Sequence, residues 1–279
     1  MFNFIYKNLN LLFFGFLIAF ASGFGQTFFI SLFSQDFRDT FELTNTEFGS
    51  LYSIATVLSA ITIIWAGKLI DTVSLRKYTL AIILGLSITC LMASFVFNVF
   101  FLFLVIYFLR LFGQGLMGHT SRTTMARYFN TNRGKALAIS GFGFSVGEII
   151  YPAAVVFLLL TIGWRLTWFR SSIFILIFFG IFFYFIFKIN NFKKENDRDE
   201  KIDLGEISWR RRDVLKDFKF YMYLPLSLLM SFTVTGFLFH QVYIAEIKSW
   251  TLINLAQGFI FYAISGIIGS IISGILIDK

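Results

Sequence analysis

Long apolar runs separated by short polar segments extend along almost the whole chain. Each run is about 20 residues long, which is the length that an α-helix needs to cross the hydrocarbon layer of a bilayer. The runs are continuous and lack the alternation of membrane β-strands. We therefore expect eight transmembrane spans, at residues 11–32, 48–69, 78–97, 99–121, 136–160, 168–187, 220–243 and 253–275.

The composition agrees with this pattern. Of the 279 residues, 57% are hydrophobic and only 14% are charged, and the mean hydropathy is +0.75. Soluble domains carry about 25% charged residues. The expected fold class is all-α, a bundle of membrane helices whose surroundings are the lipid bilayer.

The segments between the spans differ in charge. Residues 34–47 carry a net charge of −3, whereas residues 67–77 carry +2 and residues 122–135 carry +4. Basic segments of membrane proteins stay in the cytoplasm, so we expect a protein of the cell (inner) membrane with a cytoplasmic N-terminus. This topology accounts for the net charge of +8, and no nucleic-acid partner is expected. His119 and Arg122, at the cytoplasmic end of the fourth span, are expected to face water.

Sequence motifs of common enzyme sites are missing. The chain has no H-E-x-x-H, G-x-S-x-G or G-x-x-x-x-G-K-[ST] pattern. Its lone cysteine, Cys90, permits neither an intramolecular disulfide nor a thiolate metal cluster. We expect no enzymatic activity, no cofactor and no metal site.

Residues 188–219 differ sharply in composition from the rest of the chain. They hold ten Lys and Arg residues and eight Asp and Glu residues, which is typical of a solvated linker. The expected organisation is an N-terminal six-helix bundle at 1–188, a charged cytoplasmic linker at 189–219, and the two-helix start of a C-terminal bundle at 220–279.

A short motif occurs twice, each time at the end of an expected span. Gly67-x-x-x-Asp71 follows the second span, and Gly274-x-x-x-Asp278 ends the eighth. Both halves of the chain begin on the same side of the membrane, so the two copies indicate a parallel repeat about an axis along the membrane normal. The glycine permits close helix approach, and the aspartate can face a cation or a helix N-terminus.

Residues 67–77 resemble the loop motif G-x-x-x-D-[RK]-x-G-x-[RK]-[RK] of the major facilitator superfamily. The matching positions are Gly67, Asp71, Arg76 and Lys77. Thr72 replaces a basic residue and Ser74 replaces a glycine, which weakens the motif's charge network. The resemblance implies that this segment and its second copy act as a gate, and anchoring of the topology by the basic residues is the alternative.

Two further features concern the same resemblance. Arg110 followed by Gly113 and Gly115 is similar to a family motif of the fourth span. The Gly-Pro-x-x-Gly-Gly signature of drug antiporters is absent from the fifth span, which counts against a drug exporter. The glycine-rich first span, Arg110 with Gln114, and Glu148 resemble the organic-anion (monocarboxylate and oxalate/formate) branch more closely. The family has twelve spans in two six-helix halves, so we expect this chain to hold six plus two of them and to be truncated.

Two ionisable residues are expected near the middle of the bilayer. Arg110 lies about ten residues into its span, or roughly 15 Å at 1.5 Å per residue, and Glu148 lies at a similar depth in the fifth span. A charge at this depth costs at least about 2.5–3.5 kcal/mol, so both side chains should face the bundle interior. In the functional interpretation Arg110 binds an anionic substrate and Glu148 takes up or releases a proton. The structural alternatives are a permanent ion pair between them, or, as the family resemblance implies, a role of Arg110 in a network on the cytoplasmic side.

Three more polar residues complete the expected site. Gln114 lies one turn after Arg110 on the same helix face, where its amide can bind a carboxylate or bond to a neighbouring helix. Gln26 and His240 lie near the outer ends of the first and seventh spans. His240 either carries a proton or is an ordinary interfacial side chain.

The expected function is secondary active transport. Arg110 and Glu148 together favour a proton- or exchange-coupled carrier, such as a symporter, of a small organic anion such as a monocarboxylate. The partners would be the bilayer, an anionic small molecule and protons. A drug or other small-solute exporter of the same fold, and a non-transporting fragment, are the alternatives.

Overall fold

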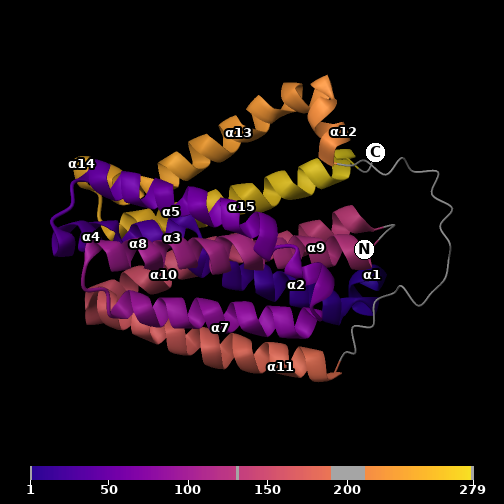
Figure 1. The fold of residues 1–279 in the computed structure, drawn as a ribbon, viewed down its shortest axis with the longest axis horizontal. Coiled ribbons are helices and arrows are strands. Elements are labelled where there is room, and N and C mark those ends of the chain that lie inside the picture. The colour runs from indigo at the N-terminus through magenta and orange to yellow at the C-terminus, as the bar shows by residue number, and fades with distance from the viewer. Residues whose placement is uncertain (1, 130–131, 190–210, 278–279) are drawn as a thin grey trace.

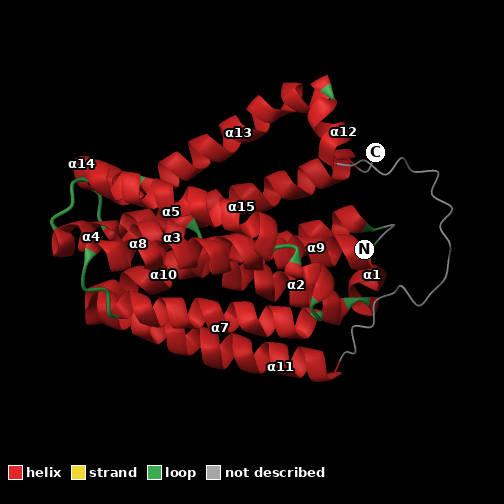
Figure 2. Ribbon diagram, in the orientation of Figure 1, coloured by secondary structure: helices red, strands yellow, loops and turns green. Residues whose placement is uncertain are grey.

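The computed structural model describes residues 2–129, 132–189 and 211–277, and every regular element in these ranges is a helix (Figure 2). The helices run roughly along one long axis (Figure 1). The described chain begins with α1 (Phe2–Lys7) and finishes with α15 (Leu252–Ile277) at one end of this bundle, while α4 (Ser34–Phe41) and α14 (Gln241–Ile247) lie at the other. The expected all-α membrane fold is confirmed.

The remaining elements follow in chain order, with 3₁₀ turns at η1 and η2 and π-helical stretches at η3 and η4. They are α2 (Leu9–Ala21), η1 (Ser22–Gly25), α3 (Thr27–Ile30), η2 (Ser31–Phe33), α5 (Asn45–Ala66), α6 (Leu69–Thr72), α7 (Leu75–Ser94), α8 (Val99–Leu109), η3 (Arg110–Met117), α9 (Gly118–Tyr128), α10 (Arg133–Phe174), η4 (Ile175–Phe179), α11 (Gly180–Ile189), α12 (Arg211–Lys216) and α13 (Phe218–Phe239).

The first span is broken, which the apolar pattern did not predict. Its two parts, Leu9–Gly25 and Thr27–Phe41, are bent by 40° at Gln26, whose backbone is extended. The second part continues as helix through most of the segment that we expected to be a loop at 34–47. The turn itself is short and ends at Thr44, which forms a capping box with Glu47 at the start of α5.

The fourth span is longer than expected. One helical stretch runs from Val99 to Tyr128 through α8, η3 and α9. Arg122 and Arg127 therefore lie on the helix, not in the loop that follows it. The extra turns are held by packing, since Thr124 and Met125 are buried. Ser121, just before them, is also buried and donates a hydrogen bond to the Gly15 carbonyl of α2 (2.9 Å).

Gly163 divides α10 into the expected fifth and sixth spans. Its φ of 76° and ψ of 170° interrupt the helical backbone, and a positive φ is far easier for glycine than for other residues. Arg165 fixes the turn by donating to the carbonyls of Ser94 (3.1 Å), the last residue of α7, and Val96 (2.9 Å), just beyond it. The expected turn at residues 163–165 is therefore present.

Five helical stretches in the described ranges are long and apolar enough to cross a membrane, or six if the bent first pair forms one span. One of them, residues 133–188, holds two expected spans on either side of Gly163. By length and apolarity the structure therefore accommodates seven of the eight expected spans. The remaining expected span, at 220–243, corresponds to α13. This helix is 22 residues long but is not one of these five or six stretches.

Small polar side chains join the helices inside the apolar core. Ser87 of α7 and Ser172 of α10 bond reciprocally, each hydroxyl donating to the other residue's carbonyl (3.0 and 2.8 Å). Tyr151 of α10 donates to the Phe20 carbonyl of α2 (3.0 Å). Such bonds satisfy buried polar groups where no water is present, and they fix how neighbouring helices sit against one another.

The last helices pack on the earlier ones in two places. α15 packs along α10, and α13 packs against α3. Near the α4 end, a set of bonds joins the first span to α13 and α14, and we name it the α4–α14 contact. Its members are Phe28, Ser31, Arg38, Leu238, Gln241 and Glu246.

Most of the expected charged linker at 189–219 lies outside the described residues, as does Asp278 of the second motif copy. The described part of the linker includes the short helix α12 and the residue Asp217, which caps α13. Gly274 lies on α15.

Candidate functional site

A polar cavity of about 720 Å³ is lined by residues of the first, second, fourth and fifth spans. Its wall includes four of the five residues expected from the sequence: Gln26, Arg110, Gln114 and Glu148. These come from the break in the first span, from η3 and from α10. The other polar side chains in its wall are Thr56, Ser59, His119, Arg122 and Ser145.

Arg110 is the most deeply placed charge in this wall, since only 5% of the residue is exposed. One guanidinium nitrogen, Nη1, donates to Thr27 Oγ1 (3.1 Å) and, at a longer distance, to the Gly25 carbonyl (3.4 Å). The guanidinium carbon also lies 5.3 Å from the centroid of the Tyr52 ring. These partners are all uncharged, and Nε of Arg110 has no hydrogen-bond partner in the described structure.

Glycines bring the backbone that carries Arg110 against the broken first span. A Cβ on Gly113 would lie only 2.5 Å from Cα and 2.6 Å from N of Gly25, closer than real Cβ contacts allow. The π-helical turn from Arg110 to Met117 adds to this unusual geometry, and π-bulges occur frequently at functional sites. The local sequence Arg110-Leu-Phe-Gly-Gln-Gly therefore places the arginine directly beside the Gln26 break.

Glu148 lies on the same wall but does not pair with Arg110. In the described residues the ion pairs are Arg38–Glu246 and Arg127–Asp71. The structural alternative of a permanent Arg110–Glu148 pair is therefore not what the structure contains. The two charges share one cavity, and each is left available to a third group within it.

The two glutamines of the wall add polar groups beside Arg110. Gln26 donates weakly to Ser22 Oγ (3.5 Å). The side-chain oxygen of Gln114 is buried and has no hydrogen-bond partner in the described structure. Unsatisfied buried polar atoms are uncommon and often mark a place where a ligand or water binds.

His119 and Arg122, which we expected to face water, also line the cavity. Arg122 is exposed, and its guanidinium lies 5.4 Å from the centroid of the Phe144 ring. His119 is half-buried beside Gly67, within 3.4 Å of where a Cβ on that glycine would lie. The sequence placed both residues near the end of a span, and the extension of α9 to Tyr128 puts them inside it instead.

The structure does not bring His240 to the cavity. This histidine is exposed at the junction of α13 and α14, with its ring against that of Phe239. Its neighbour Gln241 is the buried residue, at 2% exposure, and donates to the Phe28 carbonyl (2.8 Å) and to Ser31 Oγ (2.6 Å). The two positions are adjacent in sequence, so the apolar pattern alone could not distinguish the inward-facing one.

Residues of the Gly67–Lys77 motif contact their own half of the molecule. Asp71 forms an ion pair with Arg127 at the end of α9, and Arg127 also donates to the Ile70 carbonyl (3.3 Å). The guanidinium of Arg76 lies 5.7 Å from the centroid of the Tyr184 ring. Ser74, which departs from the family motif, caps α7 by accepting from the Lys77 amide (3.5 Å).

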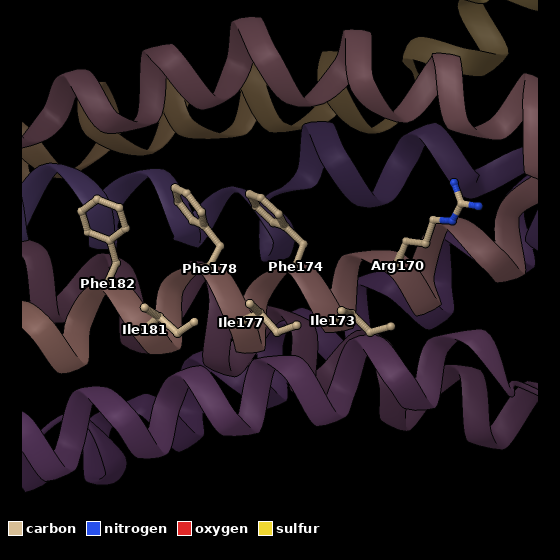
Figure 3. A pocket seen from close by; sticks show the side chains of 7 residues that line it. All are labelled: Arg170, Ile173, Phe174, Ile177, Phe178, Ile181 and Phe182. Atoms are coloured by element: carbon tan, nitrogen blue, oxygen red, sulfur yellow. The ribbon is translucent and has the colours of Figure 1, made fainter.

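A second cavity, of about 660 Å³, is a groove on the sixth span (Figure 3). Arg170 lies at one end of it, and two rows of apolar side chains follow: Ile173, Ile177 and Ile181 in one row, Phe174, Phe178 and Phe182 in the other. All these apolar residues are at least 36% exposed. This is the face that we expect to contact lipid, so it is not the candidate site.

Together these features define a multi-pass helical membrane protein with a polar cavity, lined by cations, inside its bundle. Residues 15–279 match the family model for the Major Facilitator Superfamily, and the chain belongs to that superfamily. It is a secondary transporter of the superfamily, a class of transporters and not of enzymes. A comparison with curated proteins finds no match.

Proposed function

We propose that this protein is a coupled carrier of a small organic anion, such as a monocarboxylate. The observation that carries the proposal is the buried Arg110 guanidinium, which lines the cavity and is held by neutral groups only. A cation far from water is strongly stabilised by an opposite charge. A carboxylate entering the cavity supplies that charge.

The surrounding side chains suit a small anion. Arg122 is a second cation of the wall, and the hydroxyl groups of Thr56 and Ser145 are hydrogen-bond donors. Glu148 is the wall's one carboxylate among the described residues. We propose that it carries the coupling proton, because protonation removes its charge when the anion arrives and reduces their repulsion.

The direction of access follows from the charge distribution. We place the N-terminus and residues 67–77 in the cytoplasm, where basic segments are retained. The α4–α14 contact then closes the outer side, and the cavity extends from Gln26 toward Arg122 on the cytoplasmic side. This arrangement corresponds to a carrier open inward.

Uptake into proteoliposomes tests the proposal. We would measure accumulation of labelled formate, acetate, lactate and oxalate, with ethidium as a probe for drug export. We expect at least one anion to accumulate faster than in protein-free liposomes, and Arg110→Gln to reduce its uptake at least about tenfold, since hydrogen bonds to charged groups contribute about 1.5–3 kcal/mol.

Arg170→Gln is the matched control for this experiment. It removes the same charge from the lipid-facing groove, outside the polar cavity, and should leave uptake unchanged. Transport of ethidium with no transport of any anion would replace the proposed substrate class by that of a drug exporter. Equal uptake by the two arginine variants would place the anion site elsewhere.

A further inference from the structure

Tyr52, on α5, touches the Arg110 site directly. The side chain is buried, with 4% exposure. Its hydroxyl donates to Thr27 Oγ1 (3.0 Å), the same oxygen that accepts from Arg110 (3.1 Å). Its ring centroid lies 5.3 Å from the guanidinium carbon, a distance at which a cation and an aromatic ring attract each other. Tyr52 therefore contacts Arg110 both through a shared partner and through its ring.

The same ring contacts the other half of the molecule. The Tyr52 and Phe239 ring centroids are 4.7 Å apart, and Phe48 stacks on Phe239 from the next turn of α5 (5.7 Å). Phe239 is the last residue of α13 and lies two positions before Gln241. Gln241 donates the buried bonds of the α4–α14 contact. Tyr52 is thus adjacent to that contact as well.

We propose that Tyr52 is a positioning residue that couples the state of Arg110 to the α4–α14 contact. An anion that binds Arg110 competes with Thr27 and with the Tyr52 ring for the guanidinium. Once these interactions weaken, Tyr52 no longer holds Phe239 in place, and the two halves separate at that end. The inference rests on the proposed function in one respect, which is that a bound anion triggers the change. A ligand shifts an equilibrium only by interacting differently with the two states.

A pair of spin labels reports on the α4–α14 contact without any ligand. Asp39 and Lys248 are exposed on and just beyond the two helices that meet there. We would label Asp39→Cys/Lys248→Cys in a Cys90→Ser background, in lipid nanodiscs, and measure the distance distribution by pulsed EPR. The ratio of short to long distances gives the closed-to-open ratio of the contact.

The test is a double-mutant cycle between Arg110→Gln and Tyr52→Leu. Substituting Arg110 releases Thr27 and Tyr52, so we expect the closed-to-open ratio to fall about threefold or more, a size typical of residues in contact. In the Tyr52→Leu background the same substitution should change the ratio little. Independent effects, in which the double variant shows the product of the two single changes, would overturn the proposal.

Tyr107 supplies the matched control. It also shares a hydroxyl hydrogen bond with a threonine, Thr62 (2.8 Å), and its ring contacts that of its neighbour Phe108. Tyr107→Leu should leave the effect of Arg110→Gln intact, and loss of the effect in this control would also overturn the proposal. Tyr52→Phe keeps the ring and serves if Tyr52→Leu does not fold. Tyr52→Phe should keep part of the coupling to Arg110→Gln. Undiminished coupling would show that the Tyr52 hydroxyl takes no part in it.

Adding anions to the labelled protein separates this inference from the proposed function. Formate, acetate, lactate or oxalate should lower the closed-to-open ratio in the otherwise native protein and not in Tyr52→Leu. Coupling in the cycle without a response to any anion would support the role of Tyr52 and count against the substrate class. An anion response that persists in Tyr52→Leu would support the substrate class and count against the role of Tyr52.

Discussion

In the proposed function, individual side chains of the cavity determine what the protein transports and what drives it. Arg110 and Glu148 line one wall, and no ion pair joins them in the described residues. Removing the charge of Arg110 and removing the charge of Glu148 should therefore affect two different properties of the carrier. In the proposed function, the arginine governs whether an anion binds, and the glutamate governs whether a proton gradient drives its movement.

At this scale we predict that Glu148→Gln uncouples transport from protons. The amide has nearly the shape of the carboxyl group but cannot release a proton. In proteoliposomes, a pH gradient should no longer drive accumulation of the anion, while exchange of internal for external anion should continue. Accumulation that still follows the pH gradient in this variant would exclude Glu148 as the proton carrier.

The sequence predicted the two charges of the site but not their neighbours. Arg110 and Glu148 were recognisable because an ionisable residue in the middle of an apolar run is rare. Tyr52 and Thr27 were not, since a tyrosine or threonine in such a run is common and gives no sign of what it faces. His240 was chosen over Gln241 for its chemistry, whereas burial favours Gln241.

Among the elements, close backbone contact between the first and fourth spans positions the site. Gly25 on η1 and Gly113 on η3 leave no room for a side chain at their crossing. The apolar pattern predicted both spans but not the extended backbone at Gln26, because a single break leaves the pattern of apolar residues unchanged. The π-helical turn at Arg110 was hidden for the same reason.

We predict that Gly113→Ala destabilises the protein by about 1–3 kcal/mol, as overpacking of a close contact does. It should also weaken anion binding, because the added methyl group pushes η3 away from the first span. Gly180→Ala is the control, since a Cβ there meets nothing within 4 Å and the residue lies outside the cavity. Thermal unfolding of the two purified variants compares their stability. Equal melting temperatures would contradict the close contact between η1 and η3.

Across the whole molecule, the α4–α14 contact joins the earlier spans to α13 and α14. It combines a buried residue, Gln241, with the Arg38–Glu246 ion pair (3.0 Å), whose side chains are 15% and 34% exposed. The charge pattern of the sequence gave no indication of either interaction, because both join residues about 210 positions apart. Such pairings depend on how the two halves meet.

The two parts of this contact should differ in strength. Hydrogen bonds buried away from water are costly to lose, at about 1–3 kcal/mol, whereas exposed ion pairs contribute about 0.2–1 kcal/mol. We therefore predict that Gln241→Leu lowers the closed-to-open ratio of the labelled protein more than Glu246→Gln does. The reverse order would assign the closure to the ion pair.

We propose that Arg110 binds a small carboxylate inside the cavity, and ligand-induced thermal stabilisation of the purified protein measures this binding without any transport step. A ligand that binds the folded state raises its melting temperature according to its concentration and dissociation constant. We predict that at least one of formate, acetate, lactate and oxalate stabilises the native protein and Arg170→Gln at similar concentrations, and that Arg110→Gln requires at least about ten times more. Equal stabilisation of Arg110→Gln, or no stabilisation of the native protein by any of the four, would contradict the account.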